Sequence, residues 1–505
     1  MIQLFCVAAT RKVGGIHLEH LKRELLEDYV AYPERVLQFG TGNFLRAFFD
    51  YHIHTMNKKN LFNGQVVVVQ STSSGTVKTM NEQDGLYTLY LQGIKDNKPV
   101  SEHEVIRSIS RGLNLQDEYE EYLKLAQNPD LRFIVSNTTE AGIAFNPDDK
   151  LTDQPQKSFP GKLTAFLYKR FQAFSGDLEK GFIIFPCELI ENNGVELKRI
   201  VNQFAREWQL EEEFIEWVEK ANTFCNTLVD RIVPGYPKDS IEEKTAELGY
   251  VDQLMVVGEQ FELFVIEGPE WIKDEFPAAR AGLNVHIVDD LSSYRTKKVR
   301  MLNGAHTAMT PVAYLYGLDT VSQAVTNEAT KTFIEQVMND EIIPTLPYAK
   351  NELHEYAKDV INRFRNPYIH HYLASISLNS ISKFKTRVMP TFLDYEKSYN
   401  QLPKGILFSL SALLYFYKGK RGDEEIKLVD DEATLALFQQ LWQDESVEIG
   451  ELVKTVLSKE ELWGIDLSYV ADVVTGYVTL IHNVGMQEAL AEFLQEEGEV
   501  NESVY

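Results

Sequence analysis

Short apolar segments alternate with helical segments through the first half of the chain, and this alternation constrains the fold more than any other feature. Residues 35–40 (RVLQFG), 64–75 and 131–142 each have the pattern of a buried strand that ends in glycine or small polar residues. Residues 43–60 and 159–174 have the period of helices. Apolar strands separated by helices are typical of a parallel sheet covered on both faces. We therefore predict an α/β fold with a Rossmann-like, doubly wound sheet.

The second half of the chain changes in character after about residue 285. Residues 353–366, 406–419 and 467–485 all have helical periodicity. The segment LEHLKRELLEDYV, which precedes the first strand, also has a helical pattern. We therefore predict three parts: an N-terminal helical extension (1–30), a Rossmann-like dinucleotide-binding domain (31–285) and a mostly α-helical substrate and catalytic domain (286–505).

Charge and cysteine usage limit the possible partners. The net charge of −25 repels nucleic acid and anionic membranes. The three cysteines, Cys6, Cys187 and Cys225, are far apart and form no CxxC, so we expect a reduced, cytoplasmic chain without a disulfide frame or zinc site. The longest apolar run, residues 406–417, is too short to span a bilayer. A small-molecule substrate is the expected partner, and the oligomeric state stays open.

The segment VLQFGTGNFLRA places a glycine turn between a predicted strand and a predicted helix. Gly40 and Gly42 stand where such a turn lets a pyrophosphate approach backbone amides, although Leu45 replaces the third glycine of the usual fingerprint. The polar segment SNTTEAG follows another strand, and the carboxyl ends of parallel strands line the cofactor crevice. The predicted cofactor-binding residues are Phe39, Gly40, Thr41, Gly42, Asn43, Phe44, Thr138 and Glu140.

The end of the second predicted strand does not identify the cofactor. It carries Gln70, Ser71 and Thr72, whereas an acidic residue would be expected there to bind the adenosine ribose. The residues alone therefore leave NAD and NADP open.

The segment KKVRMLNGAHT (297–307) concentrates base, amide and imidazole. On an α-helix, Lys298, Asn303 and His306 project into one arc of roughly 140°. A lysine can move a proton while an amide and an imidazole hold an oxygen, which suits carbonyl–alcohol chemistry. Gly304 and Ala305 lack bulk, so another group can pack close to this turn. The alternative is a solvated helix start with a capping histidine.

A second basic segment spans residues 363–390. Two basic segments in an acidic chain favour an anionic small substrate, whereas the alternative is local salt bridging. Elsewhere, Asp230 and Arg231 interrupt an apolar run, which indicates either a working carboxylate or a structural pair. The basic and imidazole side chains of the second segment are Arg363, Arg365, His370, His371, Lys383, Lys385 and Arg387.

The spacing Lys298, Asn303, His306 (K-x4-N-x2-H) resembles the signature of the polyol-specific long-chain dehydrogenases, the mannitol dehydrogenase family. VLQFGTGNFLRAF, SNTTEAG, PCELIENNG, TLVDRIVPGYP and LNGAHTA follow in that family's order from about residue 33. The resemblance implies metal-independent hydride transfer with NAD(H). It assigns Lys298 as general acid/base, Asn303 as oxyanion-hole donor and His306 as the group that orients the substrate oxygen. Asp230 and Lys383 match substrate-site positions.

Two departures from the family pattern bear on the substrate. Leu189 stands where polyol-oxidising members carry an asparagine, and Ser375 stands where they carry an arginine; Asn193 is the candidate replacement for that asparagine. These changes favour a keto-hexuronate as substrate, and we expect a basic side chain to bind its carboxylate. The candidates are Lys383, as first choice, with His371, Arg365 and Arg387.

Other functions stay open. Within the same class, the alternatives are mannonate (fructuronate) oxidoreductase and a mannitol-type polyol dehydrogenase. From other classes, Lys298 can form a Schiff base in a lyase, or the chain can be a non-catalytic dinucleotide-binding protein.

Overall fold

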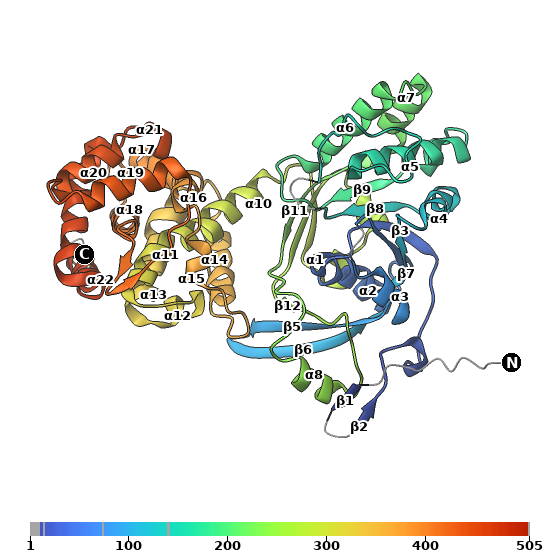
Figure 1. The fold of residues 1–505 in the computed structure, drawn as a ribbon, viewed down its shortest axis with the longest axis horizontal. Helices are drawn as coiled ribbons and strands as arrows, with labels where there is room; N and C mark the ends of the chain where they lie inside the picture. The colour runs from blue at the N-terminus through green and yellow to red at the C-terminus, as the bar shows by residue number, and fades with distance from the viewer. Residues whose placement is uncertain (1–10, 14–15, 73–74, 139–141, 503–505) are drawn as a thin grey trace. The chain divides into compact units, whose positions relative to one another are not determined.

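The computed structural model describes residues 11–13, 16–72, 75–138 and 142–502. The chain divides into two compact units. Unit 1 is Met1–Gln92 with Val100–Ser292, and unit 2 is Gly93–Pro99 with Ser293–Tyr505 (Figure 1).

Unit 1 is built on a six-stranded parallel sheet, which confirms the predicted Rossmann-like class. From edge to edge, the order is β10-β9-β8-β3-β4-β7. The chain starts at the centre with β3, proceeds to one side, and returns to β8 on the other side, so the order reverses between β3 and β8. The strands are β3 (Glu34–Phe39), β4 (Gln65–Gln70), β7 (Ile109–Asn114), β8 (Phe133–Ser136), β9 (Ile183–Pro186) and β10 (Thr223–Phe224).

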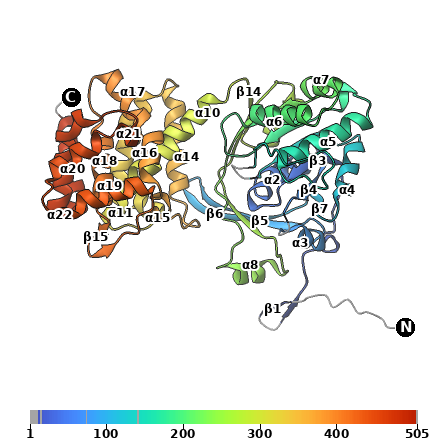
Figure 2. The same cartoon turned by 45° about the horizontal axis from the view of Figure 1, so that its top comes forward.

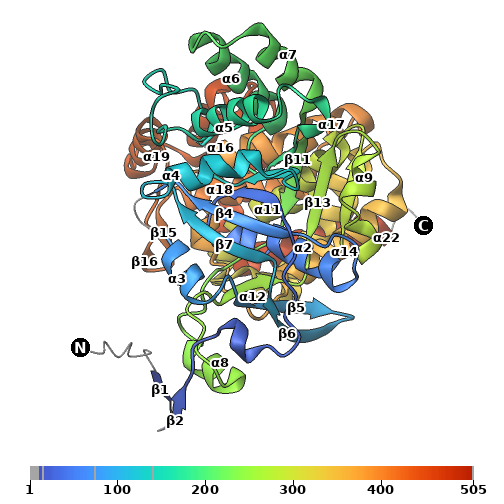
Figure 3. The same cartoon turned by 90° about the vertical axis from the view of Figure 1, so that its right-hand side faces the viewer.

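Side-chain alternation along the strands covers both faces of this sheet. Val36 of β3 belongs to a core shared with α2 (Phe49–Lys58), whereas Leu37 belongs to a core shared with the opposite helices. Figure 3 shows α5 (Phe159–Ala173), α6 (Asn193–Glu207) and α7 (Glu212–Ala221) close together in unit 1. The opposite helices are α4 (Tyr119–Lys124), α5 (Phe159–Ala173), α6 (Asn193–Glu207) and α7 (Glu212–Ala221).

The rest of unit 1 consists of smaller sheets and short helices. One sheet has the order β11-β13-β14 and another the order β12-β5-β6. The strands are β1 (Arg11–Val13), β2 (Ile16–Leu18), β5 (Tyr87–Lys95), β6 (Lys98–Ile106), β11 (Asn226–Asp230), β12 (Val256–Glu259), β13 (Leu263–Glu267) and β14 (Val285–Val288). The short helices are α1 (Asn43–Arg46), α3 (Val77–Glu82), α8 (Ile241–Leu248) and α9 (Ile272–Glu275).

The predicted helical extension at residues 1–30 is wrong over the described residues. The chain forms the β1–β2 hairpin and then a single 3-10 turn at Arg23–Leu25. Val251 donates a backbone hydrogen bond to Glu19 and accepts one from Leu21, both 2.9 Å or shorter. These tertiary hydrogen bonds hold the segment in an extended form, against the local helical pattern.

The predicted boundary between the two domains also differs from the structure. The predicted boundary lies between residues 285 and 286, whereas the structure divides the chain between Ser292 and Ser293. Residues beyond 285 stay with unit 1 because β14 pairs in parallel with β13.

Unit 2 is mostly helical. Helices α18, α20 and α22 lie side by side in it (Figure 2). Helix α22 is broken at Gly485, where φ is 80°. The helices are α10 (Ser292–Lys297), α11 (Gly304–Tyr316), α12 (Val321–Thr326), α13 (Glu328–Gln336), α14 (Lys350–Phe364), α15 (Leu373–Ile376), α16 (Ser380–Arg387), α17 (Met389–Tyr399), α18 (Lys404–Phe416), α19 (Glu432–Gln443), α20 (Ile449–Leu457), α21 (Glu460–Trp463) and α22 (Ala471–Glu502), with a small hairpin of β15 (Lys420–Arg421) and β16 (Glu424–Glu425).

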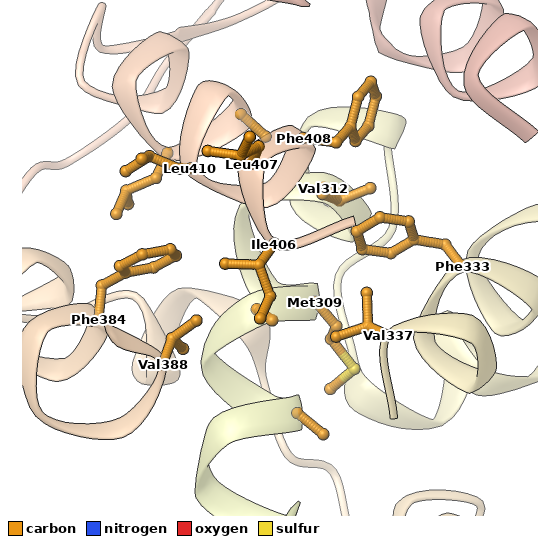
Figure 4. Close-up of a cluster of buried hydrophobic side chains, with 14 of the residues drawn as sticks. Met309, Val312, Phe333, Val337, Phe384, Val388, Ile406, Leu407, Phe408 and Leu410 are labelled. Carbon is orange, nitrogen blue, oxygen red and sulfur yellow. The ribbon is translucent and has the colours of Figure 1, made fainter. Parts of the chain in front are cut away.

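Helix α11 forms the centre of the core of unit 2. Met309 and Val312 of α11 pack among apolar side chains from α13, α16 and α18 (Figure 4). A π-helical turn at Lys298–Asn303 directly precedes α11, and another at Val337–Ile342 directly follows α13. The second π turn includes the buried Glu341, whose carboxylate accepts the N–H groups of Gly405 and Ile406 and so caps α18.

Candidate active site

The glycine turn after β3 requires glycine at one of its two positions. Gly40 has a φ of 123°, and a Cβ there would lie 2.9 Å from the carbonyl oxygen of Asn137. Gly42 has ordinary backbone geometry, and a Cβ there would meet nothing within 4 Å. The turn therefore brings bare backbone close to the end of β8.

A cavity of about 420 Å³ opens beside this turn in unit 1. It lies where the order of the strands reverses, which is the usual ligand position in an open α/β sheet. Its walls are the glycine turn, residues 69–72 at the end of β4, the segment after β8, and the start of α5. Gly40, Thr41 and Thr138, three of the predicted cofactor-binding residues, line it. The cavity therefore lies where a dinucleotide-binding site is expected.

The other predicted cofactor-binding residues lie outside this lining. The ring of Phe39 is fully buried and packs 4.9 Å from that of Phe159, so it supports the cavity from the core. Phe44 stacks on Phe48. Gly42 and Asn43 lie on the exposed side of the turn. Glu140 lies outside the described residues.

Glu188 holds Thr138 in place, and the sequence analysis did not single it out. Its buried carboxylate accepts hydrogen bonds from the Thr138 amide (3.1 Å), the Thr138 hydroxyl (2.9 Å) and the Ser136 hydroxyl (3.0 Å). Burial raises the pKa of Glu188, and these hydrogen bonds oppose that rise. The signal in the sequence was the position of Glu188 directly after an apolar strand.

Gln70, at the end of β4, lines the cavity, but its side chain is held by neighbouring backbone groups. The side chain of Gln70 donates to the carbonyl oxygen of Thr72 (2.8 Å) and accepts from the amide of Val77 (3.2 Å). Gln70 therefore builds the turn that follows its own strand. Ser71 and Thr72 line the cavity.

Two lysines also line the cavity, and sequence reasoning missed both. The segment FPGKLTAF, which contains Lys162, indicated only a helix. Lys157 is exposed, whereas Lys162 on α5 is only 2% exposed. The Lys162 ammonium donates to the carbonyl oxygen of Lys157 (2.8 Å), and burial lowers the pKa of Lys162 to about 8. At neutral pH the cavity thus contains a buried cation suited to a phosphate-bearing ligand.

The prediction that Asn193 replaces a missing oxyanion donor is wrong. Asn193 is 1% exposed, and its NH₂ group donates to the carbonyl oxygens of Pro186 (2.9 Å) and Glu188 (3.1 Å). Its amide oxygen accepts from the Thr227 amide (2.9 Å). Asn193 therefore joins β9, α6 and β11, and it offers no donor to a substrate.

Two further sequence candidates lie elsewhere in unit 1. Leu189 is 62% exposed. Asp230 ends β11 and is buried, and its role at the substrate site stays a prediction. The neighbouring Arg231 donates to three backbone carbonyl oxygens, including that of Ala47 (2.7 Å), and is therefore structural.

The segment with Lys298, Asn303 and His306 is not a regular α-helix. Lys298–Asn303 is a π-helix, and the Gly304 amide donates to the carbonyl oxygen of Val299, five residues earlier. The angles predicted for an α-helix are therefore wrong. In a π turn, residues five apart lie above one another, which places Lys298 and Asn303 on the same face. π turns inside α-helices are frequent at functional sites.

The cations beside Lys298 have structural partners of their own. Lys297 is buried and forms an ion pair with Glu352. Arg300 donates to the Thr391 hydroxyl (2.7 Å) and to Asp394 (3.0 Å). These two residues therefore fix the π turn to its neighbours.

The expectation that a neighbour packs closely at Gly304 is confirmed. A Cβ on Gly304 would lie 3.1 Å from the carbonyl oxygen of Arg387, the last residue of α16. A larger side chain would separate α16 from the start of α11.

His306 is buried, at 9% exposure, and its Nε2 atom has no hydrogen-bond partner in the described part of the chain. Its ring stacks on Phe364 and meets the ring of His371 edge-on at 4.9 Å. Burial lowers the pKa of His306 well below its usual value, and the charges of His371, Arg363, Arg387 and Lys383 lower it further. The imidazole is therefore neutral at physiological pH.

The second basic segment is divided by the fold. His371, Lys383 and Arg387 act on His306, as does the buried Arg363, which sequence reasoning did not choose. Arg365 instead lines a separate surface hollow together with His354 and Lys358.

Other expectations concern the whole chain. Cys187 and Cys225 are buried free thiols, whereas Cys6 lies outside the described residues. Across the described ranges, no set of three or more His, Cys, Asp or Glu side chains is grouped to bind a metal ion. None of the helices in those ranges has both the length and the apolar character needed to cross a bilayer.

Known sequences match both units. Residues 34–280 match the Mannitol dehydrogenase Rossmann domain, and residues 290–484 match the Mannitol dehydrogenase C-terminal domain. An altronate oxidoreductase of Bacillus subtilis (strain 168) is 54% identical over 486 residues, which are 96% of this chain and 100% of that protein. An altronate oxidoreductase of Cronobacter sakazakii (strain ATCC BAA-894) is 46% identical over 467 residues, or 91% of this chain and 97% of that protein.

Two solved structures share the fold. A D-sorbitol dehydrogenase in substrate-free form superposes with a TM-score of 0.79 at 22% identity, covering 93% of this chain and 100% of that chain. The Pseudomonas fluorescens mannitol 2-dehydrogenase, in a ternary complex with NAD and D-mannitol, gives a TM-score of 0.67 at 21% identity. That match covers 94% of this chain and 99% of the other.

Proposed function

The chain belongs to the mannitol dehydrogenase family, as its motifs predicted, and on that premise we propose that it is an NAD(H)-dependent tagaturonate reductase (altronate oxidoreductase). The reaction would convert D-tagaturonate to D-altronate in hexuronate catabolism. Support for this substrate comes from the 54% identity with an altronate oxidoreductase along its whole length. Support for the cofactor comes from the glycine turn and the cavity at the reversal of strand order.

NADH, when bound, supplies the hydride that goes to the ketone carbon. Lys298 then delivers a proton to the ketone oxygen, which becomes the hydroxyl of the product. Asn303 donates a hydrogen bond to that oxygen as negative charge develops on it. The π turn supports these joint roles because it places Lys298 and Asn303 on the same face.

The observation that carries the proposal is the buried, unpartnered Nε2 of His306. A buried polar atom without a partner is unfavourable, and a bound ligand is one group that can complete it. Because the imidazole is neutral, it can donate one N–H to the substrate oxygen and thereby orient the carbonyl group.

The substrate class follows from the charges around His306. Arg363, Lys383 and Arg387 all act on the imidazole. A hexuronate brings one carboxylate to such a cationic environment, whereas a simple polyol brings none. This favours a sugar acid over a mannitol-type polyol.

The test is NADH oxidation by the purified protein with tagaturonate, fructuronate and fructose. Turnover should be fastest with tagaturonate, and a preference for fructuronate or fructose would select one of the related activities. NADPH in place of NADH checks the cofactor, and comparable catalytic efficiency with both would contradict the NAD(H) assignment.

Controls separate the other classes. Borohydride trapping of substrate on Lys298 without nicotinamide would indicate a Schiff-base lyase. Stoichiometric NADH binding without turnover of any sugar acid would indicate a non-catalytic dinucleotide-binding protein.

A further inference from the structure

Helix α16 presents two different faces. Phe384 and Val388 are buried in the core of unit 2 (Figure 4). Lys383 and Arg387 each precede one of these two residues and are themselves four residues apart, so they share the neighbouring face of the helix. The apolar anchors therefore fix the direction of both cations.

The C-terminal end of α16 lies next to the start of α11. The carbonyl oxygen of Arg387 is so close to Gly304 that a Cβ there would meet it at 3.1 Å. The charge of Arg387 also acts on His306 and lowers the pKa of that imidazole. The end of α16 thus lies beside the group assigned to the substrate oxygen.

Arg387 differs from the other cations in this cluster. Lys383 donates to the carbonyl oxygen of Ile376 (2.7 Å) and interacts with Asp430. Arg363 interacts with Asp359. The half-buried guanidinium of Arg387 has neither a hydrogen bond nor an ion pair with any described residue, and burial alone lowers its pKa.

A partly buried guanidinium without a counter-charge is unfavourable, and a carboxylate is the group that best satisfies it. Two parallel N–H···O hydrogen bonds join a guanidinium and a carboxylate. A keto-hexuronate carries its carboxylate at one end of the carbon chain and its ketone near the other.

We propose that Arg387 binds the carboxylate of the substrate and is the residue that selects a keto-uronate over a neutral ketose. The identity of the reaction rests on the proposed function, whereas the carboxylate site rests on the free guanidinium beside His306. Lys383, the first choice from the sequence, supports the site through Ile376.

The test compares Arg387→Met and Arg387→Lys with Arg365→Met, which removes the same charge from a separate surface. The kcat/KM of each variant is measured with NADH for D-tagaturonate and for D-tagatose, its neutral counterpart. Arg387→Met should lower kcat/KM for tagaturonate by roughly ten- to a hundred-fold, mainly through KM, with a much smaller loss on tagatose. Arg387→Lys should recover part of the loss, and Arg365→Met should lose little on either substrate.

Equal losses on both substrates for Arg387→Met would overturn the proposal, as would an equal effect of Arg365→Met. A folding defect is detected by comparing the ligand-free melting temperatures of all variants, and Arg387→Lys keeps the charge if the methionine variant fails to fold.

A binding measurement separates this inference from the proposed function. Altronate should raise the melting temperature of the wild type and of Arg365→Met, but raise that of Arg387→Met much less. The neutral polyol altritol serves as the control ligand. If the wild type reduces no keto-uronate but shows this pattern, the proposed function fails and the carboxylate site stands. If altronate stabilises Arg387→Met as much as the wild type, the carboxylate site is overturned whatever the activity.

Discussion

The imidazole of His306 lies flat on the ring of Phe364, with centroids 4.4 Å apart and planes 2° from parallel. Phe364 is the last residue of α14 and is buried, so it limits the rotation of the imidazole. Residues far apart in the chain thereby fix the direction of the unpartnered Nε2.

Phe364→Leu should remove the stacking and loosen the imidazole. An aromatic pair contributes about 0.5–1.5 kcal/mol beyond its buried area. If that energy is lost from the transition state, kcat should fall by roughly two- to tenfold while the Kd for NADH stays unchanged. Steady-state kinetics and NADH fluorescence titration measure both. Phe333→Leu, in the same core but on α13, serves as the control for lost stability. A similar loss of kcat in both variants would show that Phe364 acts only through folding.

Lys298→Ala should remove the proton donor. General acid–base groups contribute roughly 10²- to 10⁴-fold, so kcat should fall by that factor while NADH binding persists. Lys385→Ala, in the second basic segment, is the matched control because its ammonium donates to a carbonyl oxygen of α21. Near-normal turnover of Lys298→Ala would remove Lys298 from the mechanism.

Lys162→Met should weaken NADH binding. The buried ammonium loses its proton around pH 8, so the wild-type Kd for NADH should rise between pH 7 and pH 9. Lys162→Met should raise the Kd at pH 7 by roughly tenfold and flatten the pH dependence. Fluorescence titration at several pH values measures this, with Lys169→Met as control because Lys169 lies on the same helix α5 but outside the cavity lining. An unchanged pH profile in Lys162→Met would assign the titration to another group.

The buried carboxyl of Asp50 should make the stability of the folded protein depend on pH. This carboxyl is fully buried, and one of its oxygens accepts from the Gln38 amide (3.1 Å). The other carboxyl oxygen and the Gln38 amide oxygen both lack a hydrogen-bond partner, a pattern that a protonated carboxyl would relieve. Burial is the main cause that raises the pKa of Asp50 from 3.8 to about 7.

The folded state therefore holds this proton more tightly than the unfolded state does. The stabilising contribution is complete below about pH 4 and is lost as the pH rises toward 7. The side chain in Asp50→Asn is neutral at every pH. The free energy of unfolding of the variant, relative to that of the wild type, should therefore increase by up to about 1.4 kcal/mol per pH unit between pH 5 and 7. Denaturant titrations test this against the exposed Asp239→Asn. A difference that does not vary with pH would show that Asp50 titrates normally.

Local pattern was sufficient for the architecture and for the motif that the family shares. The alternation of apolar strands and helices predicted the parallel sheet, because burial on both faces leaves a continuous apolar run in each strand. The strand-to-helix context also identified Gly40, whose positive φ only glycine adopts readily. Lys298, Asn303 and His306 could be identified as candidates from the sequence because they lie within one short segment.

Tertiary structure decided which side chains are available for chemistry. The spacing of Asn193 gave no sign that backbone groups of β9, of β11 and of Glu188 would use the hydrogen-bonding capacity of its amide. The pattern at residues 18–30 gave no sign of pairing with Val251. The π turn replaced the angles that an α-helix would have imposed. Arg365 and Arg387 are the same residue type, but the charge of Arg387 acts on His306, whereas Arg365 lines a separate surface hollow. Composition and period reflect the burial of each segment, whereas the partners of a polar side chain depend on residues that are distant in the chain.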